Sequence, residues 1–368
     1  MNIYLKSRIK NYKIIDKILK KKNILEKCSL SPFLKQRIGS NSRYGIVYKL
    51  KILDEKDENK DENDMPSITV KVTDSSLKCN MRELEFYNKF KRYVLRGETI
   101  HFPLTWEGIS CGDKCSFIDI NMFKDSLKKE WQEIKSKNCF LVFSELFKGD
   151  LITYAKEIQH QSEQLKTRKI LSLLFQVMMG LYILEKNNLA HGDLHTQNIL
   201  YYSLSKEKGT KKGKDKEKDK YIKYNLDGDN YELKHFKKIF VLWDFGKMKE
   251  IGTKTSHRTD WLKERDFPHF HPINCIYWDL CIFTDSLEYF LYKINLKYSK
   301  INEFINYLRT LYLSYTIRFI NKSNGKDKEK PLYSVKNMVD KLINDIKGYF
   351  NFSIIKKITK EGAKDEGK

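Results

Sequence analysis

One eleven-residue stretch, from Ala190 to Leu200, constrains the fold of this chain more than any other. It reads Ala-His-Gly-Asp-Leu-His-Thr-Gln-Asn-Ile-Leu. The apolar run Leu171 to Leu184 precedes it and is typical of a buried helix, while Asn198-Ile-Leu-Tyr begins a strand pattern. We therefore expect a polar turn between two apolar elements, with Asp193 and Asn198 five positions apart.

The polar groups of this turn suit phosphoryl transfer. A carboxylate such as Asp193 can orient an attacking hydroxyl, and the amide oxygen of Asn198 can hold a Mg²⁺ ion. A loop of this form also arises by chance. Its meaning depends on whether the chain supplies the other required groups in the right order.

Two upstream segments offer contacts for phosphates. From Arg37, two β-rich segments flank a turn of small residues, which let backbone amides approach a phosphate chain closely. The turn and its closing residues include Gly39, Ser40, Ser42, Gly45 and Val47. The short β-branched strand Ile68 to Val72 then carries Lys71, and a carboxylate on the following helix, Met81 to Phe90, could pair with it.

Two further strands frame the turn. Asn138 to Leu151 reads as a buried strand that runs into a turn, where backbone groups can hydrogen-bond an adenine edge. Ile239 to Met248 is a second buried strand pattern and contains Asp244-Phe-Gly246. Asp244 follows Asn198 by 46 residues and can supply a second metal ligand.

These elements, in this order, resemble the signature set of the protein-kinase-like family. The resemblance covers roughly residues 37–320. It implies an α+β, bilobal protein-kinase-like fold, with a small β-rich N-lobe at 37–146 and a larger helical C-lobe at 147–368. It further implies ATP and Mg²⁺ as substrate and cofactor, and a protein as the acceptor.

The resemblance also assigns roles to single residues. Asp193 matches the catalytic base, Asn198 and Asp244 the Mg²⁺ ligands, and Lys71 the contact to the α- and β-phosphates. Glu83 matches the partner of Lys71, with Glu85 as a rival. Remaining matches are Phe143 beside the adenine pocket, Ser144 and Leu146 as backbone contacts to adenine, and Asp279 as the brace beneath the catalytic loop.

Several positions depart from the family pattern. Gly192 replaces the usual arginine before the catalytic aspartate, and His195 replaces the usual lysine two residues after it. The latter is closer to aminoglycoside or choline kinases. Ser40 or Asn41, and Ser42, stand where glycines are expected in the phosphate loop. No Ala-Pro-Glu closes the activation segment, and a packed turn is a better interpretation of His269 and His271 than a metal site.

Three functions remain open at this stage. The first is a divergent serine/threonine protein kinase, resembling those of large DNA viruses in its hinge-like segment and Trp-Asp-Phe-Gly motif. The second is a small-molecule kinase of the aminoglycoside or choline type, which His195 favours. The third is a pseudokinase scaffold that binds partners without chemistry.

Composition adds expectations about partners and location. The formal charge of +22 indicates weak attraction to polyanions through Lys-rich segments. Residues 1–36 predict a basic helical extension, and a disordered Lys-rich insert is expected at about 205–223. The seven cysteines lack a framework spacing, which predicts reduced thiols. No run approaches the ~20 apolar residues of a membrane span, so we expect a soluble protein in the cytoplasm, or in the host cytoplasm or virion if viral.

Overall fold

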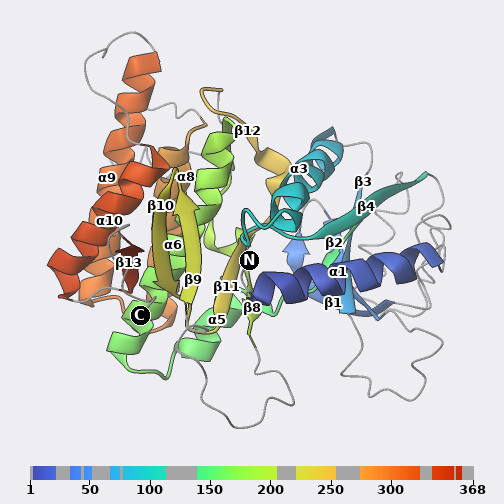
Figure 1. Cartoon of the computed structure of the whole chain (residues 1–368), viewed down its shortest axis with the longest axis horizontal. Coiled ribbons are helices and arrows are strands. Elements are labelled where there is room, and N and C mark those ends of the chain that lie inside the picture. Colours follow the sequence, from blue (N-terminus) through green and yellow to red (C-terminus); the bar gives the residue numbers. More distant parts are fainter. Residues whose placement is uncertain are drawn as a thin grey trace, which may run out of the picture. The chain divides into compact units, whose positions relative to one another are not determined.

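The structure is a computed structural model that describes residues 3–21, 34–42, 45–51, 67–74, 78–112, 139–204, 221–253, 274–323, 334–351 and 354–358. Its contacts divide the chain into two compact units, essentially Ile3–Leu146 and Phe147–Lys368. Each unit has its own buried core. The helices and strands of both units are labelled in Figure 1.

Unit 1 is built on a five-stranded antiparallel sheet with the order β1-β2-β3-β5-β4. Its strands are β1 (Leu34–Ser42), β2 (Gly45–Lys51), β3 (Ser67–Asp74), β4 (Thr105–Gly112) and β5 (Cys139–Glu145). In β3, Ile68 and Val70 are fully buried, and Lys71 on the opposite face is only 6% exposed. Both faces of this central strand are therefore covered.

Two helices complete the described part of unit 1. Helix α3 (Lys78–Leu95) buries Tyr87, Phe90 and Val94, which recur at helical spacing. Helix α1 (Ile3–Lys21) buries Leu5, Ile15 and Leu19. The expected extension at 1–36 therefore contains a helix within its first part, while β1 already begins at Leu34 rather than near residue 37.

Arg8 joins α1 to the end of the sheet. Its guanidinium donates to the carbonyl oxygens of Ile100 and Phe102 at 2.7 and 2.8 Å. It also forms a salt bridge of 2.5 Å with Glu145, the last residue of β5. Glu145 accepts in turn from the backbone N–H of Leu104. The helix is thus an integral part of unit 1.

Unit 2 is mainly helical. Its helices are α5 (Leu151–Ile158), α6 (Glu163–Lys186), α8 (Ile276–Lys293), α9 (Lys300–Ser323) and α10 (Val335–Phe350). Every residue of α6 from Ile170 to Leu184 is buried. Among the described residues α6 alone is long and apolar enough to cross a membrane, but 89% of its apolar window is buried inside the protein. It is the core helix of this unit.

Short strands surround α6 in three small sheets. One has the order β11-β8-β6, the second β12-β7 and the third β13-β10-β9. Their bounds are β6 (Gly149–Asp150), β7 (Leu189–Ala190), β8 (Ile199–Ser203), β9 (Tyr221–Leu226), β10 (Asp229–Lys234), β11 (Lys238–Leu242), β12 (Lys249–Glu250) and β13 (Ile355–Ile358). The single-turn helices η4 (Thr196–Asn198) and η6 (Phe245–Lys247) follow β7 and β11.

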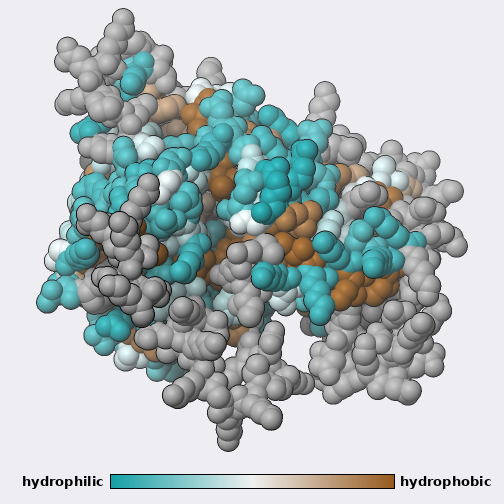
Figure 2. Space-filling view, viewed as in Figure 1, coloured by the Kyte–Doolittle hydropathy of each residue, from teal (hydrophilic) through white to brown (hydrophobic). Residues whose placement is uncertain are grey.

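The sheet β13-β10-β9 was not expected from the sequence. Asp227 and Gly228, both at positive φ, make the two-residue turn between β9 and β10. Phe175 of α6 contacts the rings of Tyr224 and Tyr231, so this sheet covers the core helix. Over the hairpin and α10 the visible surface is mostly hydrophilic (Figure 2).

The Lys-rich insert falls within this region. Residues 205–220 of the predicted segment lie outside the described residues. The predicted end at about residue 223 is too late, because β9 begins at Tyr221 and pairs with β10 over its whole length. Hydrogen bonding to β10 gives these lysine-bearing residues a strand conformation that composition does not reveal.

The cysteines differ from each other in state. Cys275 and Cys281 are buried free thiols, as expected. Cys111 in β4 is disulfide-bonded, so the expectation of reduced thiols is wrong for this residue.

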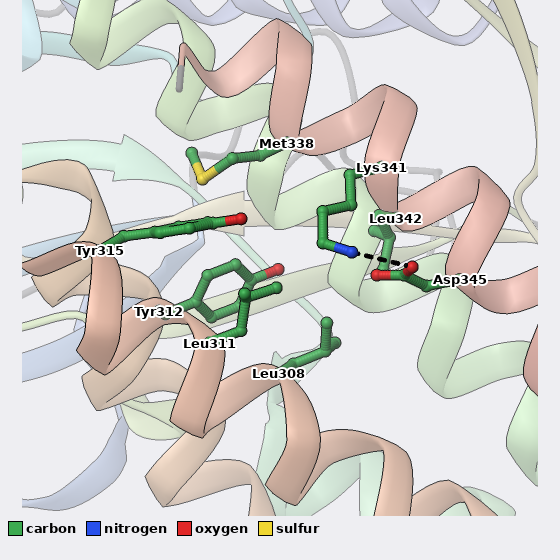
Figure 3. A pocket seen from close by; sticks show the side chains of 8 residues that line it. All are labelled: Leu308, Leu311, Tyr312, Tyr315, Met338, Lys341, Leu342 and Asp345. Carbon is green, nitrogen blue, oxygen red and sulfur yellow. Dashed lines mark hydrogen bonds and ion pairs between the residues drawn. The ribbon is translucent and has the colours of Figure 1, made fainter. Parts of the chain in front are cut away.

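A small pocket lies between α9 and α10 (Figure 3). Its lining is apolar and aromatic apart from Lys341 and Asp345, which pair with each other at 3.1 Å. None of the lining residues belongs to the turn around Asp193 or to the strands that flank it. The chemistry expected from the sequence lies elsewhere in unit 2.

Candidate active site

Lys71 of β3 and Glu83 of α3 form a buried ion pair in unit 1. The Lys71 ammonium lies 2.9 Å from both carboxylate oxygens of Glu83, and the side chains are 7% and 2% exposed. Tyr87, one turn along α3, donates to the same carboxylate at 2.7 Å. The rival, Glu85, is exposed. The helix period explains this difference, because Glu83 shares the buried face with Tyr87.

The expected phosphate loop is a β-hairpin. Strands β1 and β2 pair antiparallel, with Ile38 opposite Val47 and Ser42 opposite Gly45. The register is irregular between Ile38 and Ser42, which places Gly39 and Ser40 in the irregular stretch. In such a stretch some backbone N–H groups make no hydrogen bond to the paired strand. Such N–H groups can donate to a ligand.

The three residues expected beside adenine lie at the end of β5 and directly after it. Ser144 pairs with Thr69 of β3 through their hydroxyls, 2.6 Å apart. Thr69 also donates to the Ser144 carbonyl oxygen at 3.2 Å. Phe143 is fully buried, while Leu146 follows the strand and is half-buried. Both expected backbone contacts therefore belong to unit 1.

In unit 2, Asp279 holds the loop that carries Asp193. Its two carboxylate oxygens accept from the backbone N–H groups of His191 and Gly192, at 2.7 and 2.8 Å. Asp279 lies in the first turn of α8 and is fully buried. Burial raises the pKa of its carboxyl to about 7, against the two backbone hydrogen bonds that favour the charged form.

His191 fixes the same loop from its side chain. Its Nε2 lies 2.9 Å from the carbonyl oxygen of Trp243, and its ring contacts Phe245 edge to face. Burial lowers the pKa of His191, so the ring is neutral near pH 7 and donates from Nε2. The loop is thus tied to the segment that contains Asp244.

Strand pairing brings Asn198 and Asp244 to one end of the β8–β11 ladder. Ile199 lies opposite Leu242, and the N–H of Trp243 donates to the carbonyl oxygen of Asn198 at 2.9 Å. The Asn198 side-chain nitrogen donates to the carbonyl of Asp193 at 2.9 Å. Its amide oxygen remains as an acceptor. Asp244 has a left-handed backbone, with φ of 63°.

Among the described residues, Asp193 faces the basic side chains of Lys247 and His195. Lys247, the residue after Asp244-Phe-Gly246, places its ammonium 2.9 Å from Oδ2 of Asp193. Nε2 of His195 lies 3.9 Å from the same oxygen. The other ring nitrogen of His195 accepts from the N–H of Gln197 at 3.2 Å, so it caps η4. The Asp193 side chain is 13% exposed.

One comparison with known proteins finds a similarity to a described family. The sequence profile described as "Protein tyrosine and serine/threonine kinase" matches residues 131–231, which include β5, α6 and the loop of Asp193. A search of curated proteins finds no match. This part of the chain is similar to the tyrosine and serine/threonine kinases. Its helices and antiparallel sheets fit the α+β fold of that family.

The profile match does not extend to several of the candidate site residues. Lys71, Glu83 and Asp244 lie outside residues 131–231. Their placement rests on the structure, which pairs Lys71 with Glu83 and sets Asp244 at the strand end next to Asn198. Lys247 was missed in the sequence, although its position directly after Asp244-Phe-Gly246 was a signal that could have found it.

The donors present fit a magnesium ion. An amide oxygen from Asn198 and a carboxylate from Asp244 are hard oxygen ligands, which Mg²⁺ combines with water and substrate phosphates. Among the described residues no group of three or more His, Cys, Asp or Glu side chains could hold a metal by itself. A kinase-like site needs no such cage, because the nucleotide supplies further oxygens. His269 and His271 lie outside the described residues.

Proposed function

We propose that this kinase-like protein uses Mg²⁺ and ATP to phosphorylate serine or threonine hydroxyls of proteins. The observation that carries the proposal is the arrangement at the end of the β8–β11 ladder. There, the hydrogen bonds of Asn198 hold its side chain against the loop of Asp193 and its backbone against Trp243, next to Asp244. A base and two metal ligands are the groups that phosphoryl transfer requires.

Transfer of the γ-phosphoryl group forms one bond to phosphorus and breaks another. The acceptor oxygen forms a bond to the γ-phosphorus, and the bond from that phosphorus to the β-phosphate oxygen breaks. ADP leaves, and Asp193 accepts the proton of the acceptor hydroxyl. Asn198 and Asp244 would hold a Mg²⁺ ion, which would neutralise charge on the phosphate oxygens.

In this proposal the residues of unit 1 bind the nucleotide. Its ion pair supports a role for Lys71 as the contact to the α- and β-phosphates, because Glu83 fixes the ammonium in a water-poor setting. The β1–β2 hairpin, with Gly39, Ser40, Ser42, Gly45 and Val47, would cover the phosphates. Ser144 and Leu146 would offer backbone groups to adenine.

A small-molecule acceptor is the alternative that a specific residue favours. His195 stands in the loop near Asp193, where aminoglycoside and choline kinases resemble this chain. The two functions differ in the acceptor of the phosphate, which is a protein hydroxyl in one and a small-molecule hydroxyl in the other. They therefore separate in an experiment that offers both kinds of acceptor.

The test is transfer of radiolabelled γ-phosphate from ATP with Mg²⁺ to a panel of acceptors. The panel contains acidic and basic proteins, choline and aminoglycosides. We expect label on protein, and acid hydrolysis that yields phosphoserine or phosphothreonine. Phosphotyrosine would show that the protein acceptor residue is tyrosine rather than serine or threonine. Label on a small molecule alone would establish the small-molecule kinase. Nucleotide binding without transfer to any acceptor would favour a pseudokinase scaffold.

A further inference from the structure

Lys247 is a described neighbour of Asp193 that the sequence did not single out. It lies in η6, immediately after Asp244, Phe245 and Gly246. Its ammonium contacts the Asp193 carboxylate at 2.9 Å, although the two residues are 54 positions apart. This contact requires an explanation, because a cation beside a catalytic base affects both the base and its substrate.

Gly192 makes the approach of the Lys247 segment possible. A Cβ at residue 192 would lie 2.6 Å from the backbone carbonyl oxygen of Lys247, which is closer than real Cβ atoms come. Gly192 also has a φ of +75°, which side chains other than glycine rarely adopt. The loop therefore packs directly on the backbone of Lys247, and only a glycine permits it.

The Lys247 ammonium keeps the capacity to bind an anion. A lysine ammonium carries three N–H donors, and its contact with Asp193 is to one oxygen. The side chain is 35% exposed, so solvent or a ligand reaches it. A pair formed only for stability would gain little at the exposed Lys247 end, since solvent-exposed ion pairs contribute about 1 kcal/mol or less.

Charge considerations point to the ligand. In phosphoryl transfer, negative charge spreads over the oxygens of the transferring group, close to the attacking hydroxyl. That hydroxyl must lie within hydrogen-bond reach of Asp193. An ammonium 2.9 Å from Asp193 is consequently close to the transferring group as well. His195, the other basic side chain at Asp193, uses Nδ1 as an acceptor for Gln197.

We propose that Lys247 contacts the γ-phosphate of ATP and stabilises its charge during transfer. The inference rests on the proposed kinase function. It adds to that function a phosphate-binding cation supplied from the segment after Asp244, with Gly192 providing the space. Removing one such donor from an enzyme typically lowers turnover by about 100-fold or more.

The test compares full-length wild type with Lys247→Met and Lys247→Arg. Lys249→Met is the matched control, since it removes one lysine charge two residues away in β12. Calorimetry with Mg²⁺ measures dissociation constants for ADP and for a non-hydrolysable ATP analogue. Steady-state assays measure kcat and KM for ATP, and melting curves verify that each variant is folded.

We expect Lys247→Met to bind ADP as wild type does and to lose most of any preference for the analogue over ADP. Its kcat should fall by about 100-fold. Lys247→Arg should retain the preference, and Lys249→Met should match wild type. A lower kcat with an unchanged preference would overturn the proposal, because Lys247 would then only orient Asp193. If the wild-type protein bound nucleotide but transferred phosphate to no acceptor, that result would instead contradict the proposed kinase function.

Discussion

The N–H of Gly192 donates a hydrogen bond of 2.8 Å to Oδ1 of Asp279, a residue 87 positions further along the chain. The N–H of His191 donates to the other oxygen of the same carboxylate at 2.7 Å. One buried side chain at the start of α8 therefore fixes the backbone of the loop that carries Asp193.

The first prediction concerns Asp279 and pH. Its pKa is about 7 in the folded protein and 3.8 ordinarily, so between these values the folded state binds more protons than the unfolded state. The unfolding free energy should therefore decrease as pH rises through this window, by up to about 1.4 kcal/mol per pH unit. Asp279→Asn cannot titrate and should lack this contribution.

Urea denaturation of wild type and Asp279→Asn at several pH values measures this difference. The variant should be less stable at low pH by about 1 to 3 kcal/mol, because an amide nitrogen cannot accept the second backbone N–H. The difference in unfolding free energy between wild type and Asp279→Asn should become smaller as the pH rises toward 7. Parallel pH profiles for the two proteins would contradict the assignment.

The second prediction concerns the ion pair of unit 1. Glu83→Gln removes the charge that faces the buried Lys71 ammonium and should cost about 3 kcal/mol of stability. Affinity for ATP should fall with it. Glu85→Gln is the matched control, because Glu85 is exposed on the same helix. Equal effects of the two substitutions on unfolding would be inconsistent with the pairing.

The third prediction separates backbone strain from close packing at Gly192. Gly228→Ala places a side chain at positive φ with no atom within 4 Å, and should cost about 1 to 2 kcal/mol. Gly192→Ala adds a clash with the Lys247 carbonyl, so its cost should be greater by at least about 1 kcal/mol. Denaturation midpoints measure both. Equal costs would show that the loop does not pack on Lys247.

The fourth prediction concerns the attachment of α1. Arg8→Ala leaves Glu145 buried without its guanidinium and frees the carbonyl oxygens of Ile100 and Phe102, so it should cost about 2 kcal/mol or more. Lys20→Ala on the same helix breaks an exposed pair with Asp16 and should change stability by less than about 0.5 kcal/mol. Thermal melts compare them. If Arg8→Ala lowered the stability no more than Lys20→Ala does, the contacts of Arg8 would not attach α1 to the rest of unit 1.

The sequence predicted the parts of the site that depend on local pattern. The turn between the apolar helix and β8, with Asp193 and Asn198, follows from periodicity and spacing over a few residues. The strand end before Asp244 is equally local. Glu83 was preferred to Glu85 on the resemblance, and helical periodicity supports the same choice, since residues 83, 87, 90 and 94 form the buried face of α3.

What the sequence did not predict depends on distant contacts. Strand β13 pairs with β10 across more than a hundred residues, and no local pattern specifies such a partner. The contacts of Arg8 with Glu145 and of Lys247 with Asp193 are non-local in the same sense. A lysine in a Lys-rich chain carries no signal of its own, so its role emerges only when the fold brings it to a carboxylate.

The central claim is that Asp193 acts in phosphoryl transfer from ATP, and one comparison tests it most directly. Wild type and Asp193→Asn are assayed for transfer to protein with Mg²⁺, alongside calorimetric binding of ADP. The account predicts that the variant binds ADP like wild type and loses transfer by at least about 100-fold. Undiminished transfer by Asp193→Asn would contradict it.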